Sequence, residues 1–124
     1  MKSKVIIILL FAFAACSSEG DKKRRPVEGV YVTTYESEYS KATDTIKITP
    51  FNKRAGTFNY VRRVGFRRIS NGVLGPMEHK TEASICVFNE TTAQLNEQRH
   101  GRIYSLSLDG NQLVLGNSIY KRIQ

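Results

Sequence analysis

The chain has 124 residues, of which 40% are hydrophobic, 24% charged and 10% aromatic. These fractions are those of an ordinary globular protein and exclude a collagen-like, coiled-coil or wholly disordered chain. The length allows one folded domain. Nineteen lysines and arginines against eleven acidic residues give a net charge of +8, which favours anionic partners without identifying one.

The first fifteen residues have the features of a signal peptide. Lys2 and Lys4 supply positive charge, and an uncharged apolar stretch follows from Val5 to Ala15. A membrane-spanning helix needs about 20 apolar residues, so this stretch is too short to span a bilayer and is typical of a signal-peptide core. We therefore expect residues 1–15 to direct export.

The residues that follow indicate how the exported chain is held. The sequence Phe-Ala-Ala-Cys, ending at Cys16, resembles the lipobox of bacterial lipoproteins, although Phe13 stands where the family usually has an aliphatic residue. The resemblance implies that Cys16 carries acyl chains such as palmitate, and Ser17 resembles the signal for the outer membrane. The alternative is cleavage after Ala14 by an ordinary signal peptidase at an A-x-A pattern, which would leave a soluble protein.

Residues 16–26 are expected to form a flexible basic linker, because residues 17–26 contain no large apolar side chain. The four consecutive positive charges at 22–25 either contact anionic lipid headgroups or simply stay solvated. Further along, the stretch from Thr45 to Met77 contains seven basic residues and no acidic residue. The charge of the folded part is therefore concentrated in one stretch.

Residues 27–124 show two-residue alternation and turn signals, with no helical periodicity. Pro50 is expected to stop one strand, Gly65 to mark a bulge, and Gly75-Pro76 to form a turn. The pattern predicts eight strands, at Gly29–Tyr35, Thr43–Thr49, Thr57–Ile69, Lys80–Phe88, Ala93–Arg99, Ile103–Leu108, Gln112–Leu115 and Ser118–Ile123.

Short connections between these strands predict antiparallel neighbours, because parallel strands need long crossovers. Closure into a barrel hides the edge strands. We therefore expect an all-β domain formed by one up-and-down antiparallel barrel of about eight strands, with a β-sandwich as the alternative. A barrel of this size encloses either its own side chains or one small ligand.

Gly29-Val30-Tyr31 at the start of the domain and Tyr120–Ile123 at its end are similar to the pattern of the lipocalin (calycin) family. In that family a Gly-x-Trp opens the first strand, and an arginine near the last strand packs over the tryptophan. This chain has no tryptophan, so the resemblance implies a cation–π contact between Arg122 and Tyr31. It also implies a binding role.

No catalytic or metal-binding motif stands out, so we expect no enzyme activity, no metal and no cofactor. His79 and His100 lack the spacing of metal ligands, and the glutamates Glu78, Glu82 and Glu97 are scattered. Cys86 lies between apolar neighbours, which favours a small buried side chain over a reactive thiol.

The arginine-rich strand at 57–69 supplies the candidate ligand-binding residues. By alternation, Tyr60, Arg62, Phe66 and Arg68 face the barrel interior, whereas Arg63 and Arg67 face outward. An unpaired buried charge is costly. The inward arginines therefore meet an anionic ligand, or a bulge at Gly65 changes their phase, or they lie at the rims, or they pair with internal carboxylates such as those of Glu82 and Glu97.

These observations predict a monomeric, lipid-anchored protein of the cell envelope, held in the outer membrane, whose barrel binds a small anionic or amphipathic ligand. The alternative is a non-catalytic structural or interaction lipoprotein of an envelope complex, with a filled barrel core. No nucleic-acid partner is expected.

Overall fold

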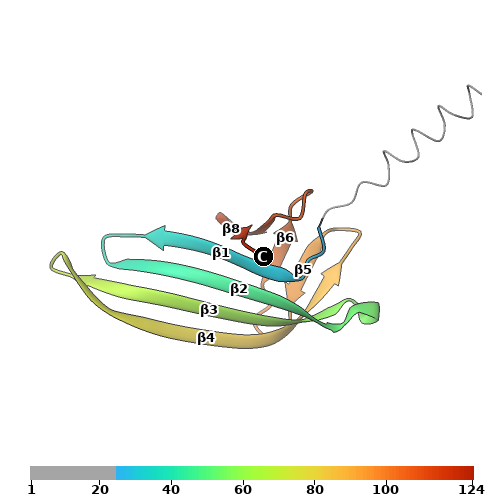
Figure 1. Ribbon diagram of the computed structural model, residues 1–124, viewed down its shortest axis with the longest axis horizontal. Coiled ribbons are helices and arrows are strands. Elements are labelled where there is room, and N and C mark those ends of the chain that lie inside the picture. The colour runs from blue at the N-terminus through green and yellow to red at the C-terminus, as the bar shows by residue number, and fades with distance from the viewer. Residues whose placement is uncertain (1–24) are drawn as a thin grey trace, which may run out of the picture.

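The computed structural model describes residues 25–124, which form one closed antiparallel barrel with the strands in sequence order (Figure 1). The expectation of an all-β, up-and-down barrel of eight strands is thus confirmed. The signal peptide, Cys16 and most of the linker lie outside the described residues. The elements are β1 Gly29–Glu36, β2 Ser40–Asn52, η1 (a 3-10 helix) Lys53–Ala55, β3 Thr57–Ser70, β4 Val73–Asn89, β5 Gln94–Glu97, β6 Ile103–Leu106, β7 Gln112–Leu115 and β8 Ser118–Arg122.

The strands differ greatly in length, and this difference shapes the molecule. β2, β3 and β4 have 13, 14 and 17 residues, whereas β5, β6 and β7 have four residues each. β4 pairs with β5 only from Cys86 onward, and β1 pairs with β8 only at Tyr31 and Val32. The first four strands therefore continue beyond the barrel as a projecting sheet (Figure 1). We call this sheet, residues 33–43 and 64–80, the arm.

The turn between β3 and β4 differs from the expectation. Asn71 and Gly72 have φ values of 52° and 77°, which two-residue hairpin turns require, and they join the two strands directly. Gly75 and Pro76 do not form a turn; they lie within β4, where the register shifts opposite Arg68. The strand therefore begins at Val73 instead of Lys80, and its 17 residues are nearly twice the expected length.

Two further expectations about irregularities were wrong. Gly65 pairs in regular register with Thr43 and His79, so it marks no bulge. β2 continues through Pro50 to Asn52, with a register shift between these two residues. A local irregularity of this kind is where a sheet tolerates proline.

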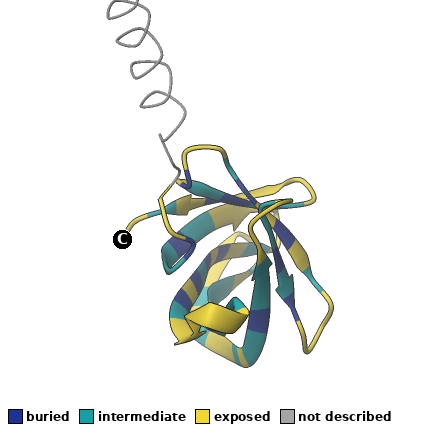
Figure 2. Ribbon diagram, turned by 90° about the vertical axis from the view of Figure 1, so that its right-hand side faces the viewer, coloured by how far each residue is buried: buried dark blue, intermediate teal, exposed yellow. Residues whose placement is uncertain are grey.

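Residues of all eight strands contribute side chains to the buried core, and Figure 2 shows these positions as dark blue bands along the strands. Four of the fully or nearly fully buried residues are tyrosines, and each hydroxyl has a hydrogen-bond partner, as burial of a polar group requires. The Tyr60 and Tyr104 hydroxyls lie 2.6 Å apart. The buried apolar cluster comprises Val27, Tyr31, Ile46, Ile48, Phe58, Tyr60, Cys86, Leu95, Tyr104, Leu106, Leu113 and Tyr120.

Candidate functional site

A buried ion pair closes the end of the barrel from which the arm projects. Asp44 of β2 is 1% exposed, and the Arg62 guanidinium of β3 donates to both of its carboxylate oxygens, through Nε at 3.0 and 3.1 Å and through Nη2 at 2.8 Å. The Tyr120 hydroxyl donates to the same carboxylate at 2.8 Å. Bidentate pairing of this kind offsets the cost of burying both charges.

Glu82 of β4 extends this network. Its Oε2 accepts a hydrogen bond from Arg102 Nη1 at 2.7 Å and lies 3.6 Å from Arg62 Nη1. The hydrogen bond from Arg102, followed by the charges of Arg102 and Arg62, lowers the pKa of the Glu82 carboxyl despite partial burial. Glu82 therefore stays ionised at neutral pH, and Asp44 and Glu82 together balance the charges of Arg62 and Arg102.

Glu97 has a different role, because it holds the turn after β5. Its carboxylate accepts hydrogen bonds from the backbone amides of Arg99, at 2.7 Å, and His100, at 3.0 Å. Burial opposes ionisation of Glu97, but hydrogen bonds from the Ser84 hydroxyl and from these amides outweigh it and lower the pKa of the carboxyl. Within residues 25–124 every buried side-chain nitrogen and oxygen atom has a partner. The buried polar side chains of the barrel interior are therefore all satisfied by other groups of the protein.

The structure separates the candidate ligand residues of β3. Tyr60 and Arg62 lie in the barrel, where their polar groups are bonded to Tyr104 and Asp44. Arg68 lies on the arm, where its exposed guanidinium pairs with Glu78 at 3.2 Å and stands 5.9 Å from the centre of the Phe66 ring. The four residues consequently do not converge on one cavity.

Arg122 closes the barrel over its first strand. Its guanidinium carbon lies 4.8 Å from the centre of the Tyr31 ring, which is the cation–π contact expected for these two residues. Nη1 also donates to the Glu28 carbonyl at 3.0 Å, and Nε donates to the Gly110 carbonyl at 2.9 Å. A Cβ atom on Gly29 would collide with the Gln124 carbonyl oxygen and lie 2.7 Å from Arg122 Nη1, so glycine is needed where the end of the chain and the arginine pass.

Cys86 is a packing residue, as expected. It is fully buried, and burial together with the nearby charge of Glu97 raises the pKa of its thiol to about 12. A thiol in that environment stays protonated and is a poor nucleophile.

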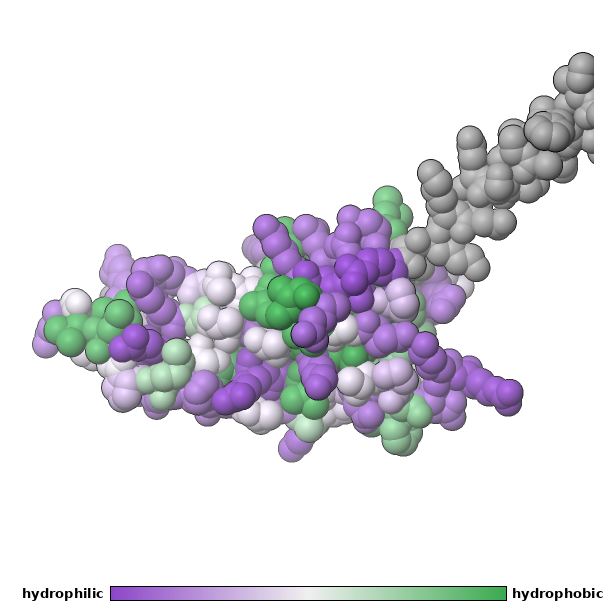
Figure 3. Space-filling model, in the orientation of Figure 1, coloured by the Kyte–Doolittle hydropathy of each residue, from purple (hydrophilic) through white to green (hydrophobic). Residues whose placement is uncertain are grey.

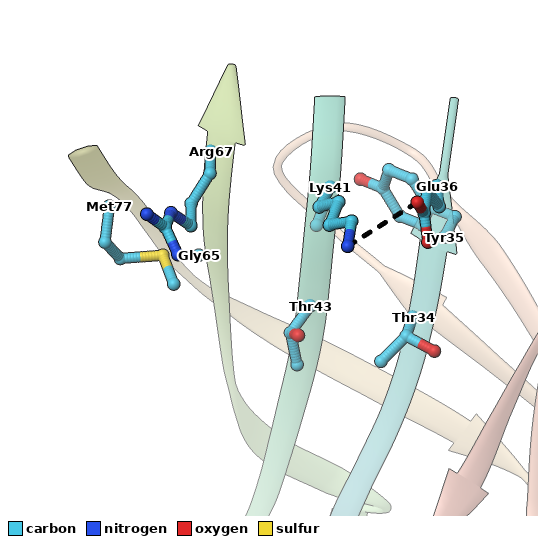
Figure 4. A pocket seen from close by; sticks show the side chains of 9 residues that line it. Thr34, Tyr35, Glu36, Lys41, Thr43, Gly65, Arg67 and Met77 are labelled. Atoms are coloured by element: carbon cyan, nitrogen blue, oxygen red, sulfur yellow. Dashed lines mark ion pairs between the residues drawn. The ribbon is translucent and has the colours of Figure 1, made fainter. Parts of the chain in front are cut away.

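An open hollow of about 410 Å³ lies on the arm (Figure 4). Most of its lining side chains belong to the face of the sheet opposite the barrel core, because they have the other parity from the buried residues. The lining residues are Thr34, Tyr35, Glu36, Lys41, Ala42, Thr43, Gly65, Arg67 and Met77.

Cross-strand alignment explains why this surface is hollow. Thr34, Thr43 and Gly65 lie directly opposite one another on β1, β2 and β3, and their small side chains form a low floor. Met77, Arg67, Lys41 and Glu36 are consecutive cross-strand neighbours on β4, β3, β2 and β1, and their longer side chains form the next row, toward the tip of the arm (Figure 4). Sequence reasoning missed the hollow because the alignment of small residues exists only once the register is known.

The charges around the hollow are only partly neutralised. Lys41 Nζ lies 3.6 Å from Glu36 Oε1, and Arg67 Nε donates to the Gly75 carbonyl at 2.8 Å. Among the described residues, no carboxylate lies within ion-pair distance of Arg67 or Arg63, which are neighbours on the same face of β3. The outward pair of arginines, rather than Arg62 and Arg68, thus offers charge to a partner.

Exposed apolar side chains gather at the free end of the arm (Figure 3). Tyr39 is 74% exposed in the β1–β2 turn, and Val73 is 68% exposed at the start of β4. The β1–β2 turn is bound to the end of β3, because the Ile69 amide donates to the Tyr39 carbonyl at 2.8 Å. Apolar groups displayed in this way are characteristic of interaction surfaces.

No family model, curated protein or solved structure matches this chain. Within residues 25–124 there is no group of three or more His, Cys, Asp or Glu side chains arranged to hold a metal ion. The same residues contain no helix that is both long and apolar enough to cross a membrane. The functional proposal is therefore based on the geometry of the barrel and the arm.

Proposed function

We propose that this protein is a non-catalytic interaction protein of the cell envelope, tethered through a lipid on Cys16. Its barrel is a filled scaffold, and its arm contacts a partner protein. The observation that supports this proposal is the contrast between the two parts. Polar groups of the barrel are paired internally, whereas the arm displays a hollow, cationic side chains and exposed apolar residues.

The filled interior argues against a ligand inside the barrel. Tyr60, Tyr104 and Tyr120 pack against one another, with ring centres 5.9 and 6.0 Å apart along the series. Arg62 already binds Asp44, so an anionic ligand would have to displace a buried carboxylate. That exchange would leave Asp44 unpaired, which is strongly unfavourable.

The hollow on the arm has the chemistry to receive an acidic side chain of a partner. The Arg67 guanidinium has donors beyond the one used by Gly75, and Lys41 is its direct cross-strand neighbour on β2. Met77 provides an apolar contact beside these charges. An acidic group flanked by apolar atoms would therefore be bound at this place.

The start of the described chain supports a tethered arrangement. The Arg25 amide donates to the Asp109 carbonyl at 3.2 Å, and the Arg25 side chain donates to Asn111 at 3.0 Å. Both partners belong to the loop between β6 and β7, at the barrel and far from the tip of the arm (Figure 1). A chain anchored through Cys16 would hold its barrel near the membrane and leave its arm accessible.

Site-specific cross-linking tests this proposal. A photoreactive residue in place of Thr43, in the hollow, should capture one envelope protein in the native host. The same substitution at Leu108, which is 92% exposed on the barrel, should not capture it. Arg67→Glu should reduce capture about tenfold or more, the value of a lost charge-assisted hydrogen bond.

Lys47→Glu is the matched control, because Lys47 is an exposed cation on the same face of β2 but outside the hollow. Equal capture from positions 43 and 108, or equal effects of the two charge reversals, would contradict the proposal. A small molecule retained by the wild-type protein in native mass spectrometry and lost in Arg67→Glu, without protein capture, would make the hollow a small-ligand site instead.

A further inference from the structure

The arm has an open strand edge on β4. Among the described residues, no strand lies along the outer side of β4 before Ile85, whose carbonyl accepts a hydrogen bond from the Gln98 amide at 2.9 Å. Because backbone groups alternate sides along a strand, the amides and carbonyls of Met77, His79 and Thr81 face this same side. An unpaired edge of this kind is a template for another strand.

We propose that the edge at Met77–Thr81 pairs with the same edge of a second copy of the chain, in antiparallel register centred on His79. This inference departs from the expectation of a monomer, goes beyond the proposed function and does not depend on the anchor at Cys16 or on the envelope partner. The two arms would then form one continuous sheet of eight strands, with the two hollows on the same face.

Charge selects this register from the alternatives. With His79 at the twofold axis, Glu78 of each copy lies opposite Lys80 of the other, which gives two favourable pairs. A register centred on Lys80 would place Lys80 opposite Lys80 and Glu78 opposite Glu82, so every charged pair would be repulsive.

A register centred on Thr81 is also disfavoured, because it uses groups that are already occupied. It would require Glu82 to face Lys80, but Glu82 is bound to Arg102 at 2.7 Å inside the barrel end. It would also use the Ala83 carbonyl, which already accepts a hydrogen bond from Arg99 Nη1 at 3.5 Å. Glu78 and Lys80 both lie on the accessible part of β4, and the pair that Glu78 makes with Arg68 at 3.2 Å is exposed to solvent, unlike the pair of Glu82.

The His79-centred register also fits the shape of the molecule. It places Gly72, at the tip of one arm, opposite Cys86, where the barrel of the other copy begins. The two barrels would therefore lie at opposite ends of the joint sheet, and pairing would stop at Thr81, because β5 and the turn after it already occupy the outer side of β4 from Ile85 onward. Each exposed apolar tip, including Val73, would lie alongside the barrel of the second copy.

Charge reversal tests the proposal, with the mature full-length protein in detergent studied by analytical ultracentrifugation. The wild type should form a dimer in a concentration-dependent manner. Glu78→Lys alone and Lys80→Glu alone should each weaken the dimer at least tenfold, since each replaces two attractive pairs by two repulsive pairs. An equimolar mixture of the two variants should dimerise again, because each copy then supplies the charge that the other lacks.

The controls separate edge pairing from misfolding and from other modes of association. Restored dimerisation in the mixture shows that both variants are folded, and Glu38→Lys, in the exposed β1–β2 turn, should leave the dimer unchanged. A wild type that stays monomeric, a mixture that does not recover, or assemblies that keep growing with concentration would overturn the proposal. None of these results would bear on cross-linking through position 43, which tests the proposed function separately.

Discussion

At the scale of single residues, the buried pair of Asp44 with Arg62 stabilises the barrel. Asp44 is buried and receives hydrogen bonds from both Arg62 and Tyr120. A carboxylate that loses its cation in such a place becomes an uncompensated buried charge. The ion pair is therefore best understood as a structural device that sets the position of β2 against β3.

Arg62→Gln should consequently destabilise the fold by about 3–5 kcal/mol, the usual cost of breaking a buried pair by removing one partner. Chemical denaturation followed by circular dichroism would measure the loss. Arg63→Gln is the control, since Arg63 is the exposed neighbour on the opposite face and should change stability by no more than about 0.5 kcal/mol. Equal effects of the two substitutions would contradict the buried-pair interpretation.

The lowered pKa of the Glu97 carboxyl should make the stability of the fold depend on pH. The folded protein lowers the pKa of this carboxyl below its ordinary value of 4.5, so ionised Glu97 favours the folded state. Its stabilising contribution is complete above pH 4.5 and is lost as pH falls through the lower folded pKa. Melting temperatures measured from neutral to acidic pH should therefore fall less steeply in Glu97→Gln than in the wild type, starting from a lower value at pH 7. Parallel curves for both proteins would show that Glu97 contributes nothing to acid sensitivity.

At the scale of elements, alternation predicted the strands and their inward faces, but it gave no information about where the barrel ends. Arg62 and Arg68 have the same parity, yet Arg62 lies where β4 approaches β5, and Arg68 lies beyond that point on the arm. The difference arises because β5–β8 are short, and the sequence of β3 contains no information about the length of those strands. Gly75-Pro76 was likewise ambiguous, because the same two residues suit a turn and a bulge.

The partner of Arg62 also required the register. The sequence suggested Glu82 or Glu97 as internal partners, and Glu82 does lie 3.6 Å away. Asp44 makes the closer pair because Asp44 faces Val64, which places its carboxylate diagonally across from Arg62 on the inner face. Two-residue periodicity identifies a face, whereas a diagonal contact needs the exact offset between strands.

A substitution at Gly65 can test the proposed binding role of the arm without lowering the stability of the protein. The φ of Gly65 lies outside the positive range, and a Cβ would meet the nearest His79 atom at 3.4 Å, which is an ordinary contact. Gly65→Ala should therefore keep or raise stability, by up to about 1 kcal/mol, because it restricts the unfolded chain. The added methyl group would raise the floor of the hollow, so cross-linking from position 43 should weaken while the melting temperature does not fall. Unchanged capture would show that the floor of the hollow is not part of the contact.

At the scale of the whole molecule, the two ends of the domain have different chemistry. At the barrel end, the loop between β6 and β7 binds Arg25, which follows Cys16 by nine positions in the sequence. The far end carries the exposed apolar turns and the open edge of β4. A tether at one end and interaction surfaces at the other would allow the arm to search for its partner while the barrel stays near the membrane.

This arrangement depends on the anchor, which the lipobox-like sequence ending at Cys16 predicts. Two or more acyl chains hold a protein stably on a bilayer, whereas a single chain binds only marginally. The wild type grown with labelled palmitate should therefore incorporate the label and sediment with membranes, and Cys16→Ser should lose the label. Cys86→Ser is the matched control, because Cys86 is buried in the barrel and should not affect labelling. Labelling that persists in Cys16→Ser, or a mature chain that begins at Ala15, would show that the protein is exported without a lipid, and the arm would then act from solution.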